Sequence, residues 1–414
     1  MNKKRFALIK TFTIIICIIA LTHRIANLRR SDSLDDFSIE DVYTNVSVSF
    51  GLKHGAAITA NGDLYTWGSN SSGQLGHGEK GSYVDTPTKV PGISDVVSVN
   101  LGEEHSVAIT TNGDLYTWGR NLNGRLGHGS AKMDISYIIL PTKVMDMANV
   151  VAINAAGDFT TAITEDGELH VLGFSNFILV RDFTSVVSVS LSHTSSIFGN
   201  VAVIDDSGKL YTGGYSSVGL GYGIRARDLR RMQIHMPHMS RSVPKIRNVI
   251  AVSLGEVHGA AITSDGALYT WGLNWNGQVG HGSDRTVEPT RIRDITNVVA
   301  VSLGENHSAA VTANGALYTW GYNRSGQLGY NSFSYNRHGF QYTDTPTKVP
   351  GLTDVVAVSL GYYYSAAITA NGSLYTWGST YGGALGDGVI GERWDFRQEP
   401  QKIMENVMIP NTPR

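Results

Sequence analysis

Residues 46–78 read VSVSFGLKHGAAITANGDLYTWGSNSSGQLGHG, and residues 97–129 read VSVNLGEEHSVAITTNGDLYTWGRNLNGRLGHG. Three later stretches repeat this pattern almost unchanged, and two more, 159–173 and 201–214, repeat it in degenerate form. The position of the tryptophan is thus filled seven times, at intervals of 41 to 58 residues, by Trp67, Trp118, Leu172, Gly213, Trp271, Trp320 and Trp377. A period near 50 residues is typical of propellers and solenoids.

Each repeat carries the signals of four strands. The segments VSVSFG, AAIT and LYTWG have the alternation and composition of strands, and an Asn-Gly, Asp-Gly or Ser-Gly pair between the second and third predicts a tight hairpin. We expect a fourth, outer strand to begin at a proline, where no ladder hydrogen bond is lost: Pro87, Pro141, Pro289, Pro346 and Pro400. The sequence therefore predicts an all-β fold, a seven-bladed β-propeller of four-stranded antiparallel blades.

Two alternatives stay open within this prediction. A parallel β-helix would also give a repeat, but it needs much shorter coils. The ring could be closed by residues 37–39, which lie where a fourth strand would precede the first repeat, or by residues 400–403 at the other end of the repeats. The sequence does not choose between these two segments.

Composition agrees with a strand-rich fold and excludes several classes of function. Of the 414 residues, 47 are glycine and 16% are charged, against about 25% charged in average proteins. The net charge of −2 gives no overall field that would attract nucleic acid or an anionic membrane. Cys17 is the single cysteine, so no disulfide can form within the chain.

The N-terminus differs from the rest of the chain. Lys3, Lys4, Arg5 and Lys10 precede a short apolar run over residues 11–21. This order is typical of an export signal, and the run is shorter than the about 20 residues of a full membrane span. We predict a signal peptide or signal-anchor segment over residues 1–26, a polar linker over 27–41 and the propeller over 42–414. The alternative is a buried N-terminal helix or strand.

The repeated string H-x-x-A-(I/V)-T-x-(N/D)-G-x-L-Y-T-W-G-x-N-x-x-G-Q-L-G resembles the repeat of the regulator of chromosome condensation family, over about residues 43–403. The resemblance implies a seven-bladed propeller. It also implies a range of functions, because the family includes a guanine-nucleotide exchange factor of a small nuclear GTPase, a secreted inhibitor of β-lactamases and many interaction domains. One fold thus carries unrelated functions.

The chemistry-bearing residues of the repeat favour structural roles. His54, His105, His258 and His307 share one repeat position. Ligands supplied one per blade would be too far apart for metal bonds near 2 Å, so we expect packing or hydrogen bonding there and no metal site. The Thr-x-x-Gly-x-Leu-Tyr-x-Trp pattern faintly resembles a sialidase motif without the required arginine cluster. No phosphate-binding loop, zinc motif or nucleophile elbow is present in the sequence, so we expect no catalytic residues and no cofactor.

Departures from the repeat are the best candidates for function, because loops carry function while blade cores are set by packing. An insertion over residues 330–342 and the corresponding connections of the neighbouring repeats are rich in aromatic residues, which resemble binding hot spots. We predict that they share one face of the disc and bind a partner: Trp275, Phe333, Tyr335, Phe340, Tyr342, Tyr381, Trp394 and Phe396. The alternative is local loop packing.

A second departure is the basic stretch over residues 225–247. An acidic partner or an anionic surface could contact it, although a solvated long loop is the simpler interpretation. The cations singled out are Arg225, Arg227, Arg230 and Arg231. No aromatic residues alternate with these cations, so nucleic-acid binding is not expected.

The sequence therefore predicts a monomeric, non-catalytic propeller that recognises a protein partner of unknown identity through loops on one face. We expect it to be extracytoplasmic, secreted or held at the membrane by the N-terminal segment. The alternative is a cytoplasmic regulator that resembles a guanine-nucleotide exchange factor of a small GTPase. A hydrolase with its site in the central mouth is a third, weaker hypothesis.

Overall fold

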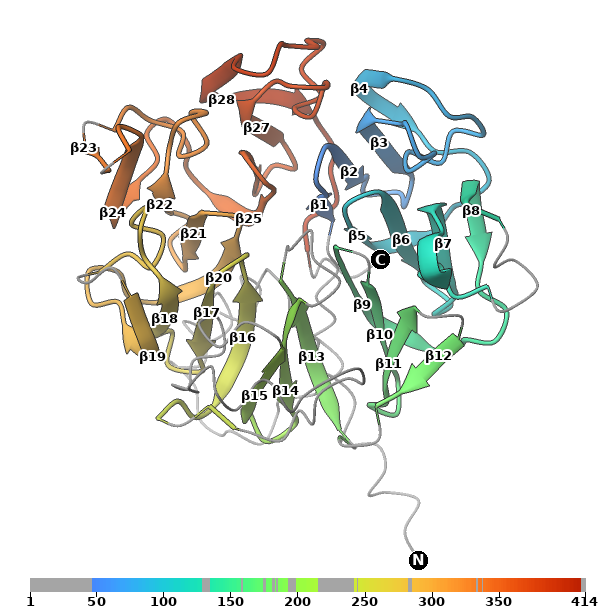
Figure 1. Ribbon diagram of the computed structural model, residues 1–414, viewed down its shortest axis with the longest axis horizontal. Coiled ribbons are helices and arrows are strands. Elements are labelled where there is room, and N and C mark those ends of the chain that lie inside the picture. The colour runs from blue at the N-terminus through green and yellow to red at the C-terminus, as the bar shows by residue number, and fades with distance from the viewer. Residues whose placement is uncertain are drawn as a thin grey trace, which may run out of the picture.

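Seven antiparallel sheets follow one another along the chain and stand around a common centre, as the ribbon in Figure 1 shows. The computed structural model describes residues 47–410, apart from 129–134, 158, 174–175, 181–182, 184, 193–198, 215–241, 244, 282–284, 333 and 337. Each sheet is one blade, and its strands run in chain order from the centre outward, except that β23 of blade 6 lies outside β24. The predicted seven-bladed propeller is confirmed.

The first three blades have four strands each. Blade 1 contains β1 (Val48–Phe50), β2 (His54–Ile58), β3 (Leu64–Ser69) and β4 (Tyr83–Lys89). Blade 2 contains β5 (Val96–Leu101), β6 (His105–Thr110), β7 (Leu115–Arg120) and β8 (Tyr137–Lys143), with the short 3-10 helix η4 (Leu122–Gly124) after β7. Blade 3 contains β9 (Val150–Ala156), β10 (Phe159–Thr164), β11 (Leu169–Gly173) and β12 (Asn176–Leu179).

The later blades show two departures from four strands. Blade 4 has three described strands, β13 (Val186–Leu191), β14 (Asn200–Asp205) and β15 (Leu210–Gly214), and Ser242 bridges Tyr211 where a fourth strand would lie. Blade 5 contains β16 (Val249–Leu254), β17 (His258–Thr263), β18 (Leu268–Leu273) and β19 (Arg285–Arg291). Blade 6 has five strands, β20 (Val298–Leu303), β21 (His307–Thr312), β22 (Leu317–Tyr322), β23 (Ser334–Tyr335) and β24 (Gln341–Lys348). Blade 7 contains β25 (Val355–Leu360), β26 (Tyr364–Thr369), β27 (Leu374–Ser379) and β28 (Phe396–Met404).

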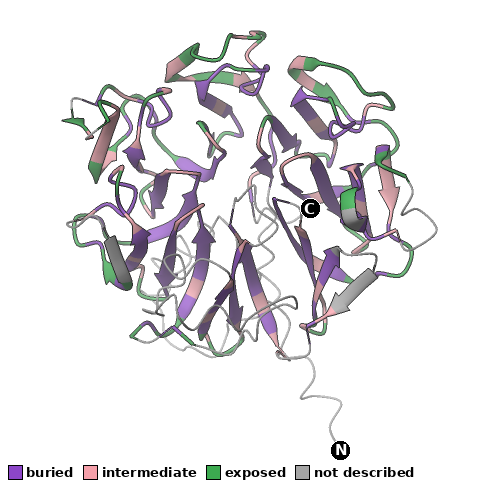
Figure 2. Ribbon diagram, in the orientation of Figure 1, coloured by how far each residue is buried: buried purple, intermediate pink, exposed green. Residues whose placement is uncertain are grey.

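Burial falls from the three inner strands to the outer strand of each blade (Figure 2). In blade 1, every residue of β2 is buried, whereas β4 is intermediate or exposed throughout. The prediction that each outer strand starts at its proline is wrong: Pro87 lies inside β4, where the register with β3 shifts between Thr66 and Gly68. The proline therefore lies in an irregular part of an edge strand, where a missing N–H costs no ladder bond.

The hydrophobic core lies between successive blades rather than at the centre of the ring. One cluster joins Ile262 and Leu268 of blade 5 to Leu303 and Trp320 of blade 6. The tryptophans of the repeat are fully buried within these layers: Trp67, Trp118, Trp271, Trp320 and Trp377.

A polar joint accompanies the tryptophan between blades 5 and 6. Trp320 Nε1 donates to the Gln278 carbonyl oxygen over 3.0 Å, and Ser308 Oγ donates to the same oxygen over 2.7 Å. His258 Nε2 lies 3.1 Å from Ser308 Oγ. Because the serine hydroxyl donates its hydrogen bond to the carbonyl, its oxygen is left to accept a hydrogen bond from the histidine N–H. Equivalent groups make the same joint between blades 1 and 2 and between blades 6 and 7. The predicted structural role of the repeated histidine is confirmed at these joints.

The ring closes through an inner strand of blade 1 that both ends of the described chain build. β1 pairs with Gly55–Ala57 of β2, and the Ser47 carbonyl accepts a backbone hydrogen bond from the Ile58 amide. Beyond the end of β1, Val407 bridges Thr59, and the Met408 amide donates to the Ile58 carbonyl over 2.8 Å. Residues 407–408 thus continue the strand that β1 begins.

Side chains complete the closure between blades 7 and 1. Tyr364 stands in the position of the repeated histidine, and its hydroxyl donates to the Gly51 carbonyl over 2.8 Å. Trp67 Nε1 donates to the Ala384 carbonyl over 2.9 Å. Of the two segments proposed for closure, residues 400–403 belong to the outer strand β28 of blade 7, and residues 37–39 lie outside the described residues.

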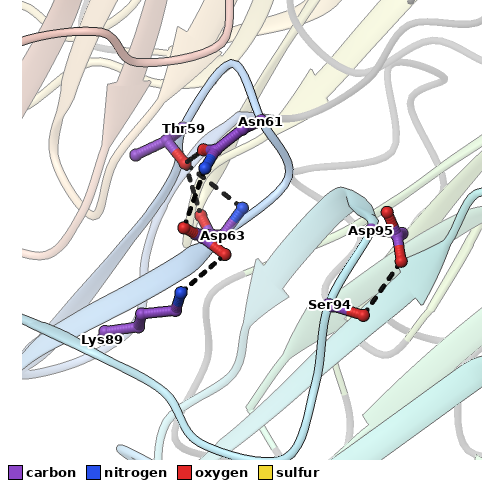
Figure 3. Close-up of polar contacts among 6 residues, drawn as sticks. All are labelled: Thr59, Asn61, Asp63, Lys89, Ser94 and Asp95. Carbon is purple, nitrogen blue, oxygen red and sulfur yellow. Dashed lines mark hydrogen bonds and ion pairs between the residues drawn. The ribbon is translucent and has the colours of Figure 1, made fainter.

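The predicted tight turns between second and third strands form one face of the disc, which we call the hairpin face. In blade 1, Gly62 of the Asn61-Gly62 pair has φ of +83°, a conformation that glycine adopts without strain. Figure 3 shows Asn61 Nδ2 donating to Asp63 Oδ2 and the ion pair between Asp63 and Lys89 at 2.8 Å. Blade 2 repeats this ion pair with Asp114 and Lys143 at 2.8 Å.

The N-terminal predictions fall on residues that the structure leaves out. The proposed signal or anchor segment (1–26) and the linker (27–41) lie outside the described residues. Within the described ranges, the structure contains no helix with the length and apolar character needed to cross a membrane.

Candidate functional site

The opposite face of the disc, which we call the loop face, carries the connections from first to second and from third to fourth strands. Antiparallel strands in equivalent sheets place equivalent connections at the same face, so the predicted aromatic residues of blades 5, 6 and 7 lie there together. Trp275, Tyr335 and Trp394 are the most exposed of them, at 55%, 61% and 59%. Single exposed apolar residues are ordinary, but several in neighbouring loops indicate an interaction surface.

The insertion of blade 6 forms a small hairpin that rests on blade 5. β23 pairs with the start of β24, and the turn is closed by a hydrogen bond from the Asn336 amide to the Phe340 carbonyl over 2.9 Å. Asn336 Nδ2 donates to Asn276 Oδ1 over 2.8 Å, next to Trp275. The insertion is therefore fixed to the neighbouring blade, and Phe340 has a defined place.

An arginine joins two of the predicted aromatic residues across blades 6 and 7. The guanidinium of Arg324 lies over the Phe340 ring, with its carbon 4.6 Å from the ring centroid, and over the Trp394 ring at 4.1 Å. Arg393 lies 5.2 Å from the Trp394 centroid. Cation–π contacts of this kind hold the rings in place while leaving part of them exposed.

Tyrosines continue this surface toward the centre of the ring. Tyr322, the last residue of β22, has its ring centroid 5.8 Å from that of Phe340 and 6.4 Å from that of Tyr363. Tyr362 lies beside Tyr363 at 5.4 Å. Tyr362 and Tyr363 occupy the loop between β25 and β26, where the other near-regular repeats have Leu-Lys, Glu-Glu, Glu-Val or Glu-Asn.

Two carboxyl groups lie at the inner end of this surface. Glu256 follows β16 and Glu305 follows β20, so equivalent loops of adjacent blades place them together. Burial, together with the neighbouring Glu256, raises the pKa of Glu305 to about 8, while a hydrogen bond from Tyr363 opposes the shift. Burial also raises the pKa of Glu256. Two carboxyls this close cannot both ionise easily, so they tend to share a proton.

The tyrosines of the surface remain protonated donors near neutral pH. Burial raises the pKa of Tyr322, and burial together with Glu305 raises the pKa of Tyr363. A carboxyl pair beside neutral phenols can exchange protons or bind a cation. We call this set the acid–aromatic surface: Glu256, Glu305, Tyr322, Arg324, Phe340, Tyr363 and Trp394.

The structure brings some of the predicted site residues into this surface and places others elsewhere. Phe340 and Trp394 belong to it, and Trp275 and Tyr335 border it on blades 5 and 6. Tyr381 lies toward blade 1 instead, 6.5 Å from the Tyr83 ring and under Lys53 at 5.3 Å.

Tyr342 and Phe396 also hold blades together. A Cβ added to Gly277 of blade 5 would lie 2.9 Å from the Tyr342 ring, and one added to Gly326 of blade 6 would lie 2.7 Å from the Phe396 ring. Each ring therefore packs on a glycine turn of the preceding blade. Phe333 and the basic residues Arg225, Arg227, Arg230 and Arg231 lie outside the described residues.

Sequence reasoning missed the acidic half of the surface. Glu256 and Glu305 occupy a regular repeat position and carry no mark of function by themselves. The available signal was the run Tyr362-Tyr363-Tyr364, which departs from the Gly-x-x-His pattern and lies beside them in the ring.

Comparison with known families agrees with this architecture. Two models of the regulator of chromosome condensation (RCC1) repeat match the chain. One matches residues 61–109, 112–163, 265–311 and 314–368, and the other 46–74, 96–125, 249–278, 298–327 and 355–383. Together these matches cover more than half of the chain.

Individual relatives show the same likeness. The ultraviolet-B receptor UVR8 of Arabidopsis thaliana is 33% identical over 271 residues, which cover 61% of this chain and 59% of the receptor. The regulator of chromosome condensation of Homo sapiens is 28% identical over 271 residues, 58% of this chain and 62% of that protein. The chain thus spans less than two thirds of the length of either relative.

A solved structure confirms the fold. The crystal structure of Prp20p from Saccharomyces cerevisiae, which was solved together with a study of its binding to Gsp1p and histones, superposes with a TM-score of 0.72. The two chains are 22% identical, and the superposition covers 88% of each. At this level of identity the likeness concerns the fold alone.

Proposed function

Since the chain belongs to the regulator of chromosome condensation (RCC1) repeat family, we propose that it is a non-catalytic regulatory propeller that binds a protein partner. We place the contact on the acid–aromatic surface of blades 5, 6 and 7. The relatives include a receptor and a regulator by name. Family membership supports a binding function, while the choice of surface rests on this chain's own side chains.

One observation carries the choice of surface. Partly exposed aromatic rings from two blades are fixed by Arg324, and ring contacts lead from them through Tyr322 to Tyr363, which hydrogen-bonds the carboxyl pair at the inner end. Ordered, partly exposed aromatic and arginine side chains are the residues that dominate binding energy at interfaces. The hairpin face offers instead small turns and ion pairs that satisfy each other.

The test is capture of a partner by the full chain and loss of capture by a matched variant. We expect Phe340→Ala combined with Trp394→Ala to reduce the affinity by at least about 100-fold, since hot-spot aromatics cost 2 kcal/mol or more each. Tyr137→Ala on β8 is the control, because Tyr137 is also an exposed ring under a cation, Lys80 at 3.9 Å. Equal capture by both variants would reject this surface.

The relatives support the regulatory alternative better than an exported propeller. Prp20p is a protein studied for its binding to Gsp1p and histones, and the family resemblance includes guanine-nucleotide exchange on a small GTPase. We therefore carry an exchange-factor-like regulator as a second candidate. Nucleotide release from a panel of small GTPases, measured with and without the chain, tests it; release at the unassisted rate throughout would count against it.

Export or membrane tethering rests on residues 1–26 alone, and we keep it as a proposal together with the division into 1–26, 27–41 and 42–414. Protease treatment of intact cells separates the two locations. A propeller that is digested from outside supports export, and one that is protected supports the regulatory alternative.

A further inference from the structure

We infer that the inner end of the acid–aromatic surface receives a lysine or arginine side chain from a segment of the protein partner. This inference rests on the proposed function and adds the chemistry of the partner. Charge complementarity with Glu256 and Glu305 selects a cationic side chain, and tyrosine rings line the place that it would take.

The carboxyl pair lacks an internal counterion. Neither Glu256 nor Glu305 forms an ion pair within the described part of the chain, although both are only half-buried. Glu305 Oε2 is itself inaccessible, and among the described residues it accepts no hydrogen bond. An unpaired buried carboxylate oxygen is costly, so Glu305 favours its protonated form in the free protein and ionises more readily when a cation lies against the exposed part of the pair.

Blade 2 shows how the same face satisfies a carboxylate when the cation is internal. Arg120, the last residue of β7, pairs with Glu104, which lies one residue after the repeat position that Glu256 and Glu305 fill. The position of Arg120 is taken by Leu273 in blade 5 and by Tyr322 in blade 6. In blades 5 and 6 the positions of both partners of this ion pair are uncharged, since Val257 and Asn306 take the position of Glu104, so this internal cation is absent beside Glu256 and Glu305.

The side chains around Glu256 and Glu305 fit a basic side chain better than they fit a metal ion, and they indicate more than a carboxyl pair that only holds a proton. Tyr363 hydrogen-bonds Glu305, Tyr322 lies close enough to Glu305 to feel its charge, and the Tyr362 ring centroid lies 5.4 Å from that of Tyr363. Aromatic faces stabilise a guanidinium or ammonium group and also pack its apolar stem. A carboxyl pair with aromatic walls therefore matches both ends of lysine or arginine.

The outer part of the surface sets the orientation of the partner. Arg324 and Arg393 place positive charge around the Trp394 ring. A basic residue of the partner is repelled from this outer part and attracted to Glu256 and Glu305 at the inner end. Apolar residues of the partner pack on Phe340 and Trp394. The expected segment carries one basic residue followed or preceded by apolar residues.

Selection from a random peptide library tests this inference without knowledge of the natural partner. A phage-displayed library of random peptides is selected on the full chain, and selected peptides are measured by fluorescence anisotropy against four proteins: wild type, Glu256→Gln with Glu305→Gln, Phe340→Ala with Trp394→Ala, and Tyr137→Ala. Gln keeps the shape of Glu, and thermal unfolding confirms that each variant is folded.

The inference predicts peptides with a Lys or Arg next to apolar residues. The double Gln variant should bind them at least tenfold more weakly, and Tyr137→Ala should bind them as wild type does. Replacing the peptide's Lys by norleucine, or its Arg by citrulline, should weaken binding to wild type by a similar factor and have little further effect on the Gln variant. This non-additivity shows that the two groups contact each other.

Three outcomes would overturn the inference, and they separate it from the proposed function. Peptides without a basic residue, or peptides that the Gln variant binds as tightly as wild type but the Phe340→Ala, Trp394→Ala variant does not, would reject the cation site and leave the binding surface standing. Peptides that bind all four proteins equally would reject both. Failure to select any peptide would likewise contradict both.

Discussion

The joints between blades and the acid–aromatic surface are built by the same repeats, yet they differ in how their polar groups are satisfied. At the joint of blades 5 and 6, His258, Ser308 and Trp320 meet the Gln278 carbonyl in a closed set of hydrogen bonds of 2.7 to 3.1 Å, with every side chain buried. In the adjoining loops, Glu256 and Glu305 are half-buried without an ion pair in the described chain.

This difference separates stability from function within one repeat. Groups that satisfy one another hold the ring together and have nothing left to offer a partner. Groups that remain unsatisfied cost stability and are available for binding. Substitutions in the two regions should therefore have opposite consequences, and the expected effects below run from the largest to the smallest.

The largest expected effect is that acid destabilises the joints between blades. Burial lowers the pKa of His54, His258 and His307 to about 3. A histidine that stays neutral in the fold contributes stability above its unfolded pKa near 6.5, and this stability is lost as the pH falls toward the folded value. Each should cost about 2 kcal/mol at pH 5, or about 6 kcal/mol for the three together. Urea unfolding at pH 7 and pH 5 measures the loss.

A variant sharpens this test. His307→Gln removes one titrating group, so the stability of this variant should depend less steeply on pH between 6.5 and 5 than that of wild type. His338→Gln, which removes an exposed ring on the loop face, should keep the wild-type dependence. A pH-independent stability in this range for wild type would show that the buried histidines do not carry the joints.

Two tryptophans compare the two regions directly. Trp320→Ala empties a fully buried site at a joint and leaves the Gln278 carbonyl without one donor, so we expect a loss of about 3–5 kcal/mol. Trp394→Ala removes a largely exposed ring and should change stability by less than about 1 kcal/mol. Chemical unfolding of the two variants gives both numbers. Similar losses would contradict the separation of the two regions.

The closure of the ring is the next test. Val407 is buried and continues the inner strand of blade 1. Val407→Asp places a charge in this strand and should cost about 2–4 kcal/mol. Glu399→Asp on the exposed outer strand β28 is the control. A variant as stable as wild type would mean that residues 407–408 do not close the ring.

At the acid–aromatic surface, removing a charge should stabilise the protein. The pKa of Glu305 is raised in the fold, so the folded state binds the proton more tightly than the unfolded chain does. Stability is therefore lost as the pH rises from about 4.5 through 8. Glu305→Gln should be roughly 1–2 kcal/mol more stable than wild type at pH 9 and equally stable at pH 4. Thermal unfolding of both proteins at the two pH values measures this difference. A variant that is less stable than wild type at pH 9 would show that the Glu305 carboxylate is satisfied in the fold.

The sequence predicts the ring because the repeat is local and regular. Strand alternation, the Asn-Gly turns and the tryptophan position each follow from neighbouring residues, and even Leu172 and Gly213 could be aligned to strands β11 and β15. The closure escaped prediction because Val407 and Val48 share a strand while lying at opposite ends of the described chain. The prolines were misplaced because a register shift inside β4 depends on pairing with β3.

The candidate site could be predicted only in part for a related reason. Phe340 and Trp394 lie in segments that depart from the repeat, and the aromatic content of these segments can be read from the sequence. Glu256 and Glu305 belong to separate repeats, and each looks ordinary alone. Their proximity, their raised pKa values and the tyrosines beside them arise only when blades 5, 6 and 7 are placed side by side.

Hydrogen–deuterium exchange of the full chain, with and without a captured partner, tests the central claim most directly. The account predicts that the partner slows exchange in the loops of the loop face, at residues 322–326, 336–340 and 392–395, and leaves the Asn-Gly turns of the hairpin face unchanged. Protection centred on those turns, or on blades 1 and 2, would contradict it.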